Sequence, residues 1–197
     1  MNKKRKFFVV SLPRTGTTSI LKMAKICGFN PKYCPHINFD PLLESSKFDF
    51  YTDMPVFSPG TIDYILLQKD VDPYFIYIDK NYLDILNSWK KTNLFYNYQH
   101  IVKTFNEHRE DILSTILFDY ESYTDAFGGN ILTEDNYEDL FANHKNMVYR
   151  KILESDKPLL VYNFNSGWKP FCDFLGVDIP NEEIPILNKD TMFEGIN

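Results

Sequence analysis

The chain has 197 residues, a formal net charge of −6 and 44% hydrophobic residues. This length suits one domain that buries about 70% of the surface its unfolded chain exposes, so neither a disulfide nor a metal is needed for folding. An aromatic content of 16% excludes intrinsic disorder for most of the chain, and the acidic balance argues against a general nucleic-acid-binding protein. No apolar run approaches the roughly 18 residues of a membrane span. We expect a cytoplasmic protein whose three cysteines form no disulfide framework.

The first strand–loop–helix unit carries the most informative sequence. A short apolar run at 7–11 is typical of a buried strand, and helical spacing follows from Thr17 until Gly28. Between them lies a turn of small and hydroxyl residues with one arginine, Pro13-Arg14-Thr15-Gly16-Thr17-Thr18-Ser19. Backbone N–H groups at a helix N-terminus bind anions, and a guanidinium adds a permanent positive charge. The segment therefore predicts a phosphate-sized anion site, although it lacks the spacing of a Walker A motif.

Strands and helices alternate along the rest of the chain. We expect further strands at 48–52, 74–78 and 159–163, and helices at 59–69, 81–91, 97–118, 133–153 and 167–175. Ser58 is the expected N-cap of the helix at 59–69, residues 31–47 are expected to be irregular, and 122–130 is expected to be a loop. The alternation predicts a three-layer α/β fold, with a mainly parallel central sheet flanked by helices.

Polar residues follow several of these strands. Ligands of parallel sheets bind at the carboxyl ends of the strands, which places Arg14, Asp53, Lys80 and 163–165 around one crevice. Lys80 and Ser88 lie eight residues apart across a strand end and the following helix. A cation with a hydroxyl suits a second phosphate, although a surface lysine and a helical serine are the simpler explanation of this pair alone.

Taken together, these segments resemble the sulfotransferases that use 3′-phosphoadenosine 5′-phosphosulfate (PAPS). Residues 13–19 are similar to their 5′-phosphosulfate loop, and 75–89 to their 3′-phosphate segment. Residues 50–55 resemble a strand-end Asp-x-Pro of one small branch, and 159–177 resemble its last strand and Gly-Trp helix. The resemblance implies a P-loop NTPase-like sulfotransferase fold in a single domain, 1–197, with a helical acceptor-side segment at about 94–153.

The resemblance also implies residue roles. Arg14 matches the catalytic cation, and the residues that match the donor loop are Thr15, Gly16, Thr17, Thr18 and Ser19. Lys80 and Ser88 match the pair that holds the 3′-phosphate, with Lys80 where the family usually has arginine and Asn81 where it usually has aspartate. Trp168 is a candidate for stacking on adenine, although core packing is the simpler explanation. Lys169 is a candidate phosphate contact.

Transfer to a hydroxyl group needs a base that takes its proton. The titratable candidates are His36, Asp53, His100, His108 and His144. We favour His36 and Asp53, because a loop between strands and a strand end can both reach the carboxyl-end crevice.

The function implied is transfer of a sulfuryl group from PAPS to a hydroxyl of a small molecule or glycan, with 3′,5′-bisphosphoadenosine (PAP) as product. No metal, nucleic acid or membrane partner is expected. Two alternatives stay open: a P-loop nucleotide kinase or other phosphotransferase, and a non-catalytic nucleotide-binding relative. The sequence names neither the acceptor nor the oligomeric state.

Overall fold

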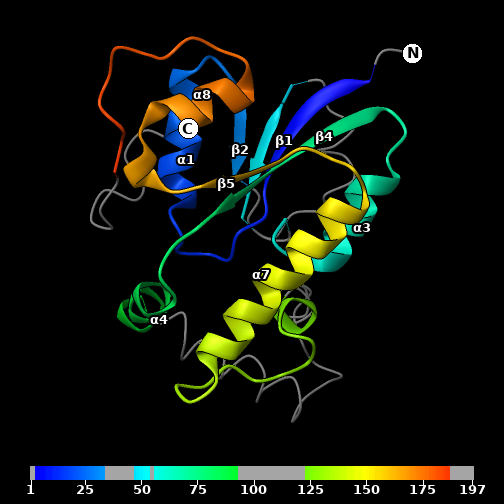
Figure 1. Ribbon diagram of the computed structural model, residues 1–197, viewed down its shortest axis with the longest axis vertical. Helices are drawn as coiled ribbons and strands as arrows, with labels where there is room; N and C mark the ends of the chain where they lie inside the picture. Colours follow the sequence, from blue (N-terminus) through cyan, green and yellow to red (C-terminus); the bar gives the residue numbers. More distant parts are fainter. Residues whose placement is uncertain (1–2, 34–46, 54–55, 93–122, 187–197) are drawn as a thin grey trace.

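The computed structural model describes residues 3–33, 47–53, 56–92 and 123–186. Within these ranges five strands form one sheet, namely β1 (Lys4–Val9), β2 (Pro31–Tyr33), β3 (Phe50–Thr52), β4 (Val71–Ile78) and β5 (Leu159–Tyr162). Their order is β2-β3-β1-β4-β5, and every neighbouring pair is parallel. Because all strands run the same way, their carboxyl ends share one edge of the sheet (Figure 1).

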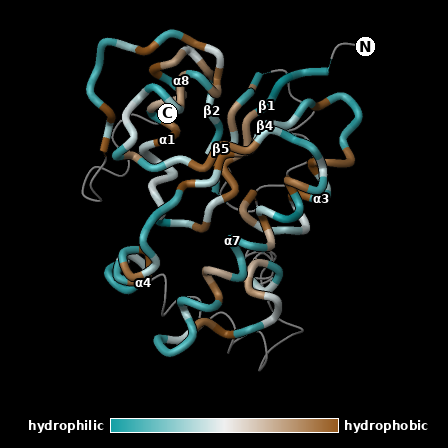
Figure 2. Tube along the Cα trace, in the orientation of Figure 1, coloured by the Kyte–Doolittle hydropathy of each residue, from teal (hydrophilic) through white to brown (hydrophobic). Residues whose placement is uncertain are grey.

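Helices cover both faces of this sheet, which confirms the predicted three-layer α/β fold. One face carries α1 (Thr17–Ile26) and α8 (Trp168–Leu175), and the other carries α3 (Pro59–Leu67) and α7 (Tyr137–Glu154) (Figure 1). Successive side chains of a strand point to opposite faces. Phe7 and Val9 of β1 accordingly lie in one buried cluster with α1 and α8, while Phe8 lies in the other with α3 and α7. Figure 2 shows the hydrophobic residues gathered along the central strands.

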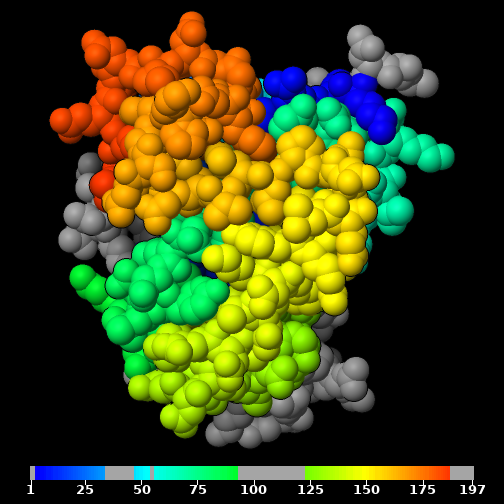
Figure 3. Space-filling view, viewed as in Figure 1, coloured from blue at the N-terminus to red at the C-terminus, as the bar shows by residue number. Residues whose placement is uncertain are grey.

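A third buried cluster lies beyond the carboxyl ends of the strands. It joins Leu12, which follows β1, to Leu86 and Trp89 of α4 (Tyr82–Lys91) and to Phe141 in α7. We call this group, with Tyr123 and its other members, the carboxyl-edge cluster. On the face seen in Figure 3, the atoms of α4 and α7 lie against each other. The cluster therefore gives α4 a fixed position beside the ends of β1 and β4.

The structure corrects some sequence-based expectations. β1 begins at Lys4 rather than at 7, because residues 4–6 pair with 71–73 of β4. Lys6 is buried there, with its Nζ donating to the Phe48 carbonyl at 3.0 Å and to the Tyr51 hydroxyl at 2.6 Å. Residues 31–33 form edge strand β2 where irregular chain was expected. The expected helix at 97–118 lies outside the described residues.

Two further corrections concern residues beside the carboxyl-edge cluster. Residues 123–126 are helical where a loop was expected, because burial of Tyr123 and Ala126 in the cluster overrides the polar composition. α3 begins at Pro59 after Ser58 as expected, but the Ser58 side chain makes no cap hydrogen bond. Its hydroxyl donates to the Asp125 carboxylate instead. None of the helices within the described ranges has the length and apolar character that crossing a membrane requires.

His144 joins α7 to the segment after β3. Its side chain is fully buried, and Nε2 donates to the Phe57 carbonyl at 2.9 Å, while Nδ1 has no hydrogen-bond partner among the described residues. Burial lowers the pKa of His144 to about 4, against the opposing effects of the Phe57 hydrogen bond and the Asp125 charge. The folded protein thus holds this imidazole neutral.

We predict that His144→Gln flattens the loss of stability in mild acid. The unfolded chain binds a proton at this position below about pH 6.5, whereas the folded chain does so only near pH 4, so stability falls as the pH drops between these values. Between about pH 7 and about pH 5, wild type should lose about 2 kcal/mol more unfolding free energy than the glutamine variant. Urea unfolding at the two pH values measures this difference. Equal losses would show that His144 titrates normally in the fold.

Candidate anion-binding site at the carboxyl edge of the sheet

The loop between β1 and α1 has an unusual backbone. Arg14 has a φ of 72° and Gly16 a φ of 119°, so two residues of this short loop lie in left-handed conformations. Gly16 occupies the N-cap position of α1, and no side chain caps the helix there. The first N–H groups of a helix have no acceptor within it, and loops that alternate handedness form concave nests of N–H groups. The loop therefore has the backbone of an anion site.

Three successive carbonyl groups of this loop each accept a hydrogen bond from a side chain. The Leu12 carbonyl accepts from Thr15 Oγ1 at 2.8 Å, and the Pro13 carbonyl accepts from Trp89 Nε1 at 2.9 Å. The Arg14 carbonyl accepts from Lys80 Nζ at 3.0 Å. Since the C=O and N–H of a trans peptide point in opposite directions, the bonds to the Pro13 and Arg14 carbonyls turn the N–H groups of Arg14 and Thr15 to the other side. The Leu12 carbonyl belongs to a peptide without an N–H, because proline follows it. The bonds also direct the carbonyl oxygens, which are the negative ends of the peptide dipoles, toward the three side-chain donors.

Two cations meet at this loop. Arg14 Nε donates to Ser88 Oγ at 3.3 Å. Lys80, which follows β4, donates to the carbonyl of Arg14. Burial lowers the pKa of the Lys80 ammonium, which the charge of Asp84 opposes and that of Arg14 lowers further. Burial also lowers the pKa of the Arg14 guanidinium, although an arginine stays charged at neutral pH. Two half-buried positive charges this close are stabilised by an anion that contacts both. The structure thus brings together the predicted residues Arg14, Lys80 and Ser88.

Asp53 lies on the other side of Arg14, at the end of β3. It is only 9% exposed, and its charge raises the pKa of Arg14, as does Tyr33 at the end of β2. Asp53 has a φ of 75°, which is uncommon for a residue with a side chain. Among the described residues, the non-glycine residues with positive φ are Arg14, Asp53 and Asp156, so two of them belong to this site. Backbone strain of this kind clusters at functional sites.

The ring of Phe164 packs against the loop at Gly16. It begins the short helix η1 (Phe164–Ser166) directly after β5. A Cβ atom added to Gly16 would lie 2.5 Å and 2.8 Å from two carbons of the Phe164 ring, so the loop backbone and this ring are in direct contact. Phe164 lies in the segment 163–165 that was expected at the crevice, but no local sequence pattern predicts its contact with Gly16, which is 148 residues earlier in the chain.

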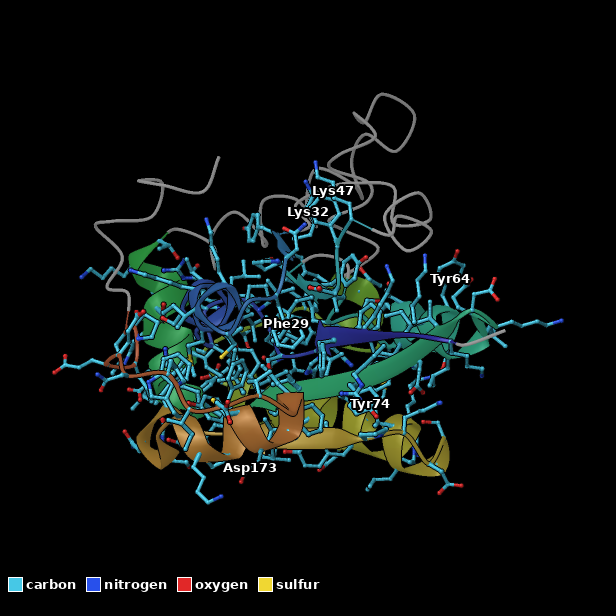
Figure 4. All side chains as sticks on the ribbon, turned by 90° about the horizontal axis from the view of Figure 1, so that it is seen from above. Phe29, Lys32, Lys47, Tyr64, Tyr74 and Asp173 are labelled. Carbon is cyan, nitrogen blue, oxygen red and sulfur yellow. The ribbon has the colours of Figure 1, made fainter. Side chains whose placement is uncertain are left out.

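The other predicted site residues lie in different surroundings. Trp168 is 8% exposed within the α1–α8 cluster, and its Nε1 donates to the Glu182 carbonyl at 2.7 Å, so little of its indole face is open to a ligand. Lys169 pairs with Asp173 at 2.7 Å on the exposed side of α8, where Figure 4 shows Asp173 pointing outward. His36 lies outside the described residues.

The remaining loop residues and Asn81 have clear local positions. Thr17 and Ser19 are buried in the first turn of α1, and Thr18 is partly exposed there. Asn81 Oδ1 accepts from the N–H groups of Leu83 and Asp84, so Asn81 caps α4 as an aspartate would.

The described ranges contain no group of three or more metal-ligating side chains.

We predict that Gly16→Ala destabilises the protein more than Gly28→Ala does. Both glycines have positive φ, but a Cβ on Gly28 meets nothing within 4 Å, whereas one on Gly16 meets the Phe164 ring. Both variants should lose about 1 kcal/mol from backbone strain, and Gly16→Ala a further 1–3 kcal/mol, approximately, from overlap. Urea unfolding measures both. Equal losses would show that Phe164 does not restrict Gly16, and adding Phe164→Ala should remove the excess.

Comparison with known families agrees with this geometry. No curated protein sequence matches the chain. A family model described as a sulfotransferase domain matches residues 37–193, about four-fifths of the chain. The match includes Asp53, Lys80 and Ser88, while the loop with Arg14 precedes it and is linked by hydrogen bonds to Lys80 and Ser88. The chain belongs to the sulfotransferase family.

Proposed function

We propose that the protein transfers a sulfuryl group from PAPS to a hydroxyl of a small molecule or glycan. The observation that carries this proposal is the meeting of Arg14, Lys80 and Asp53 at one edge of the sheet, with Arg14 and Asp53 both in left-handed conformations. Membership of the sulfotransferase family supports the reaction type.

The proposed donor site fits an anion with phosphate groups at two positions. The N–H groups of the loop at 14–19, the N-terminus of α1 and Arg14 would hold the 5′-phosphosulfate. Lys80 and Ser88 would hold the 3′-phosphate. A lysine supplies a compact charge where arginine would supply a bidentate fork, so this chain would recognise the 3′-phosphate mainly by charge. The positions of Trp168 and Lys169 do not support a role for either in this site.

PAPS supplies an activated sulfuryl group, whose bond from sulfur to the bridging oxygen breaks as a new bond forms from sulfur to the acceptor oxygen. Arg14 would stabilise the negative charge that develops on the leaving phosphate oxygen, and its role is electrostatic because arginine does not release its proton. Asp53 would take the proton of the acceptor hydroxyl. Its place beside Arg14 supports this assignment over His144, whose side chain is fully buried. His36, His100 and His108 lie outside the described residues, and of these His36 stays the favoured prediction.

The nucleotide kinase alternative is not favoured. A P-loop kinase positions its phosphates with a Walker lysine, and the loop at 13–19 has none. The family match also favours sulfuryl transfer.

We predict that Arg14→Ala lowers turnover by about 100- to 1,000-fold, because it removes charge stabilisation at the leaving oxygen. The assay measures release of PAP from PAPS with a panel of phenols, alcohols and saccharides, in the presence of EDTA. Lys22→Ala is the matched control, since Lys22 is an exposed cation on α1 and its loss changes the net charge equally. It should retain turnover within about twofold.

Several outcomes would contradict parts of this account. Wild-type turnover by Arg14→Ala would remove Arg14 from the reaction. Phosphate transfer from ATP that depends on Mg²⁺ would favour the kinase. Tight PAP binding without transfer to any acceptor of the panel would favour a non-catalytic relative.

A further inference from the structure

Trp89 is among the side chains that donate to the loop after β1, and the proposed chemistry assigns it no role. Its indole is completely buried, and Nε1 donates to the Pro13 carbonyl, 76 residues earlier in the chain, at 2.9 Å. We propose that Trp89 is a positioning residue that fixes Arg14 and the anion-facing N–H groups of its loop. The expected effect on ligand binding rests on the proposed function, whereas the fixing of the loop by Trp89 does not.

The Pro13 carbonyl belongs to the peptide that joins Pro13 to Arg14. Rotation of this peptide changes the direction of the Arg14 N–H and the φ of Arg14, which is held at 72°. A left-handed arginine costs free energy, and it persists only where its surroundings enforce the conformation. The hydrogen bond from Trp89 holds the carbonyl of this peptide, so it restricts the rotation that sets the φ of Arg14.

The neighbouring donors are less suited to hold the loop once a ligand binds. Lys80 Nζ donates to the Arg14 carbonyl, but the proposed function also requires Lys80 to contact a phosphate. Thr15 Oγ1 lies within the loop itself, so its bond to Leu12 moves with the loop. Trp89 is anchored elsewhere, and it alone of the three donors connects the loop to the buried core without being needed by the ligand.

The core around Trp89 keeps its indole in place. The rings of Tyr123, Phe141 and Phe127 lie with centroids 5.5 Å, 5.8 Å and 6.2 Å from it. Aromatic rings packed at these separations restrict one another to a single arrangement. The carboxyl-edge cluster thereby sets the direction of the Nε1–H group, and through it the position of the loop.

The test compares Trp89→Phe with Phe141→Leu. Trp89→Phe removes the N–H donor and leaves an aromatic ring, whereas Phe141→Leu loosens the same cluster and keeps the donor. Both variants should lower the melting temperature. Only Trp89→Phe should speed amide hydrogen exchange in residues 12–19 of the ligand-free protein. It should also weaken PAP binding by about 10-fold or more in isothermal titration calorimetry well below the melting temperature, while Phe141→Leu changes it by less than about twofold.

The two readouts separate the inference from the proposed function. Unchanged loop exchange in Trp89→Phe would overturn the inference, as would equal weakening of PAP binding by both variants. Faster loop exchange with unchanged PAP affinity would also overturn it, because the loop position would then not matter for the ligand. If wild type binds no PAP, the proposed donor site fails, and the exchange data alone decide whether Trp89 fixes the loop. Should Trp89→Phe fail to fold, Trp89→Tyr is measured in the same way.

Discussion

Three hydrogen bonds hold the carbonyl groups of Leu12, Pro13 and Arg14, and the candidate site depends on them. They keep a strained loop in one conformation, and the bonds to the Pro13 and Arg14 carbonyls turn the N–H groups of Arg14 and Thr15 to the opposite side. The left-handed backbone at Arg14 persists because Lys80, which follows β4, and Trp89 of α4 donate to the carbonyls on either side of it. Without these donors, the loop would relax to conformations that an arginine adopts at lower free energy.

The layered fold explains how those donors come to be there. β1 lies at the centre of a parallel sheet, with β3 on one side and β4 on the other, so the chain after each strand emerges at the same edge. β3 thereby delivers Asp53, and β4 delivers Lys80, to the two flanks of Arg14. The carboxyl-edge cluster then fixes α4, which brings Ser88 and Trp89 to the loop. Helix α4 therefore links a buried hydrophobic core to a charged site.

Much of this arrangement could be predicted from the sequence. Alternating strands and helices implied a parallel sheet, and the rule that such sheets bind ligands at their carboxyl edge placed Arg14, Asp53 and Lys80 together. The contacts that hold the loop could not be predicted in this way. Trp89 and Pro13 are 76 residues apart, and Gly16 meets Phe164 only because η1 follows the outer strand β5. Local patterns carry no information about such pairs.

Sequence patterns also failed where tertiary packing overrides local preference. Charged residues at 4–6 did not suggest a strand, yet pairing with β4 extends β1 through them. The polar segment at 123–126 is helical because its apolar side chains fill the carboxyl-edge cluster. For Trp168 the sequence context fits two roles, stacking on a ligand and core packing. The structure distinguishes them, because the side chain is buried and donates to the Glu182 carbonyl.

The most direct test of the central claim is a thermal-shift titration of the wild-type protein. The ligands are PAP, adenosine 5′-phosphate, and ATP with Mg²⁺. At about 100 times its dissociation constant a ligand adds about 2.7 kcal/mol, which raises the melting temperature of a chain of this size by several degrees. We expect a clear shift with PAP and a much smaller one with the other two nucleotides. A shift with ATP and Mg²⁺ but none with PAP would contradict a PAPS-dependent sulfotransferase.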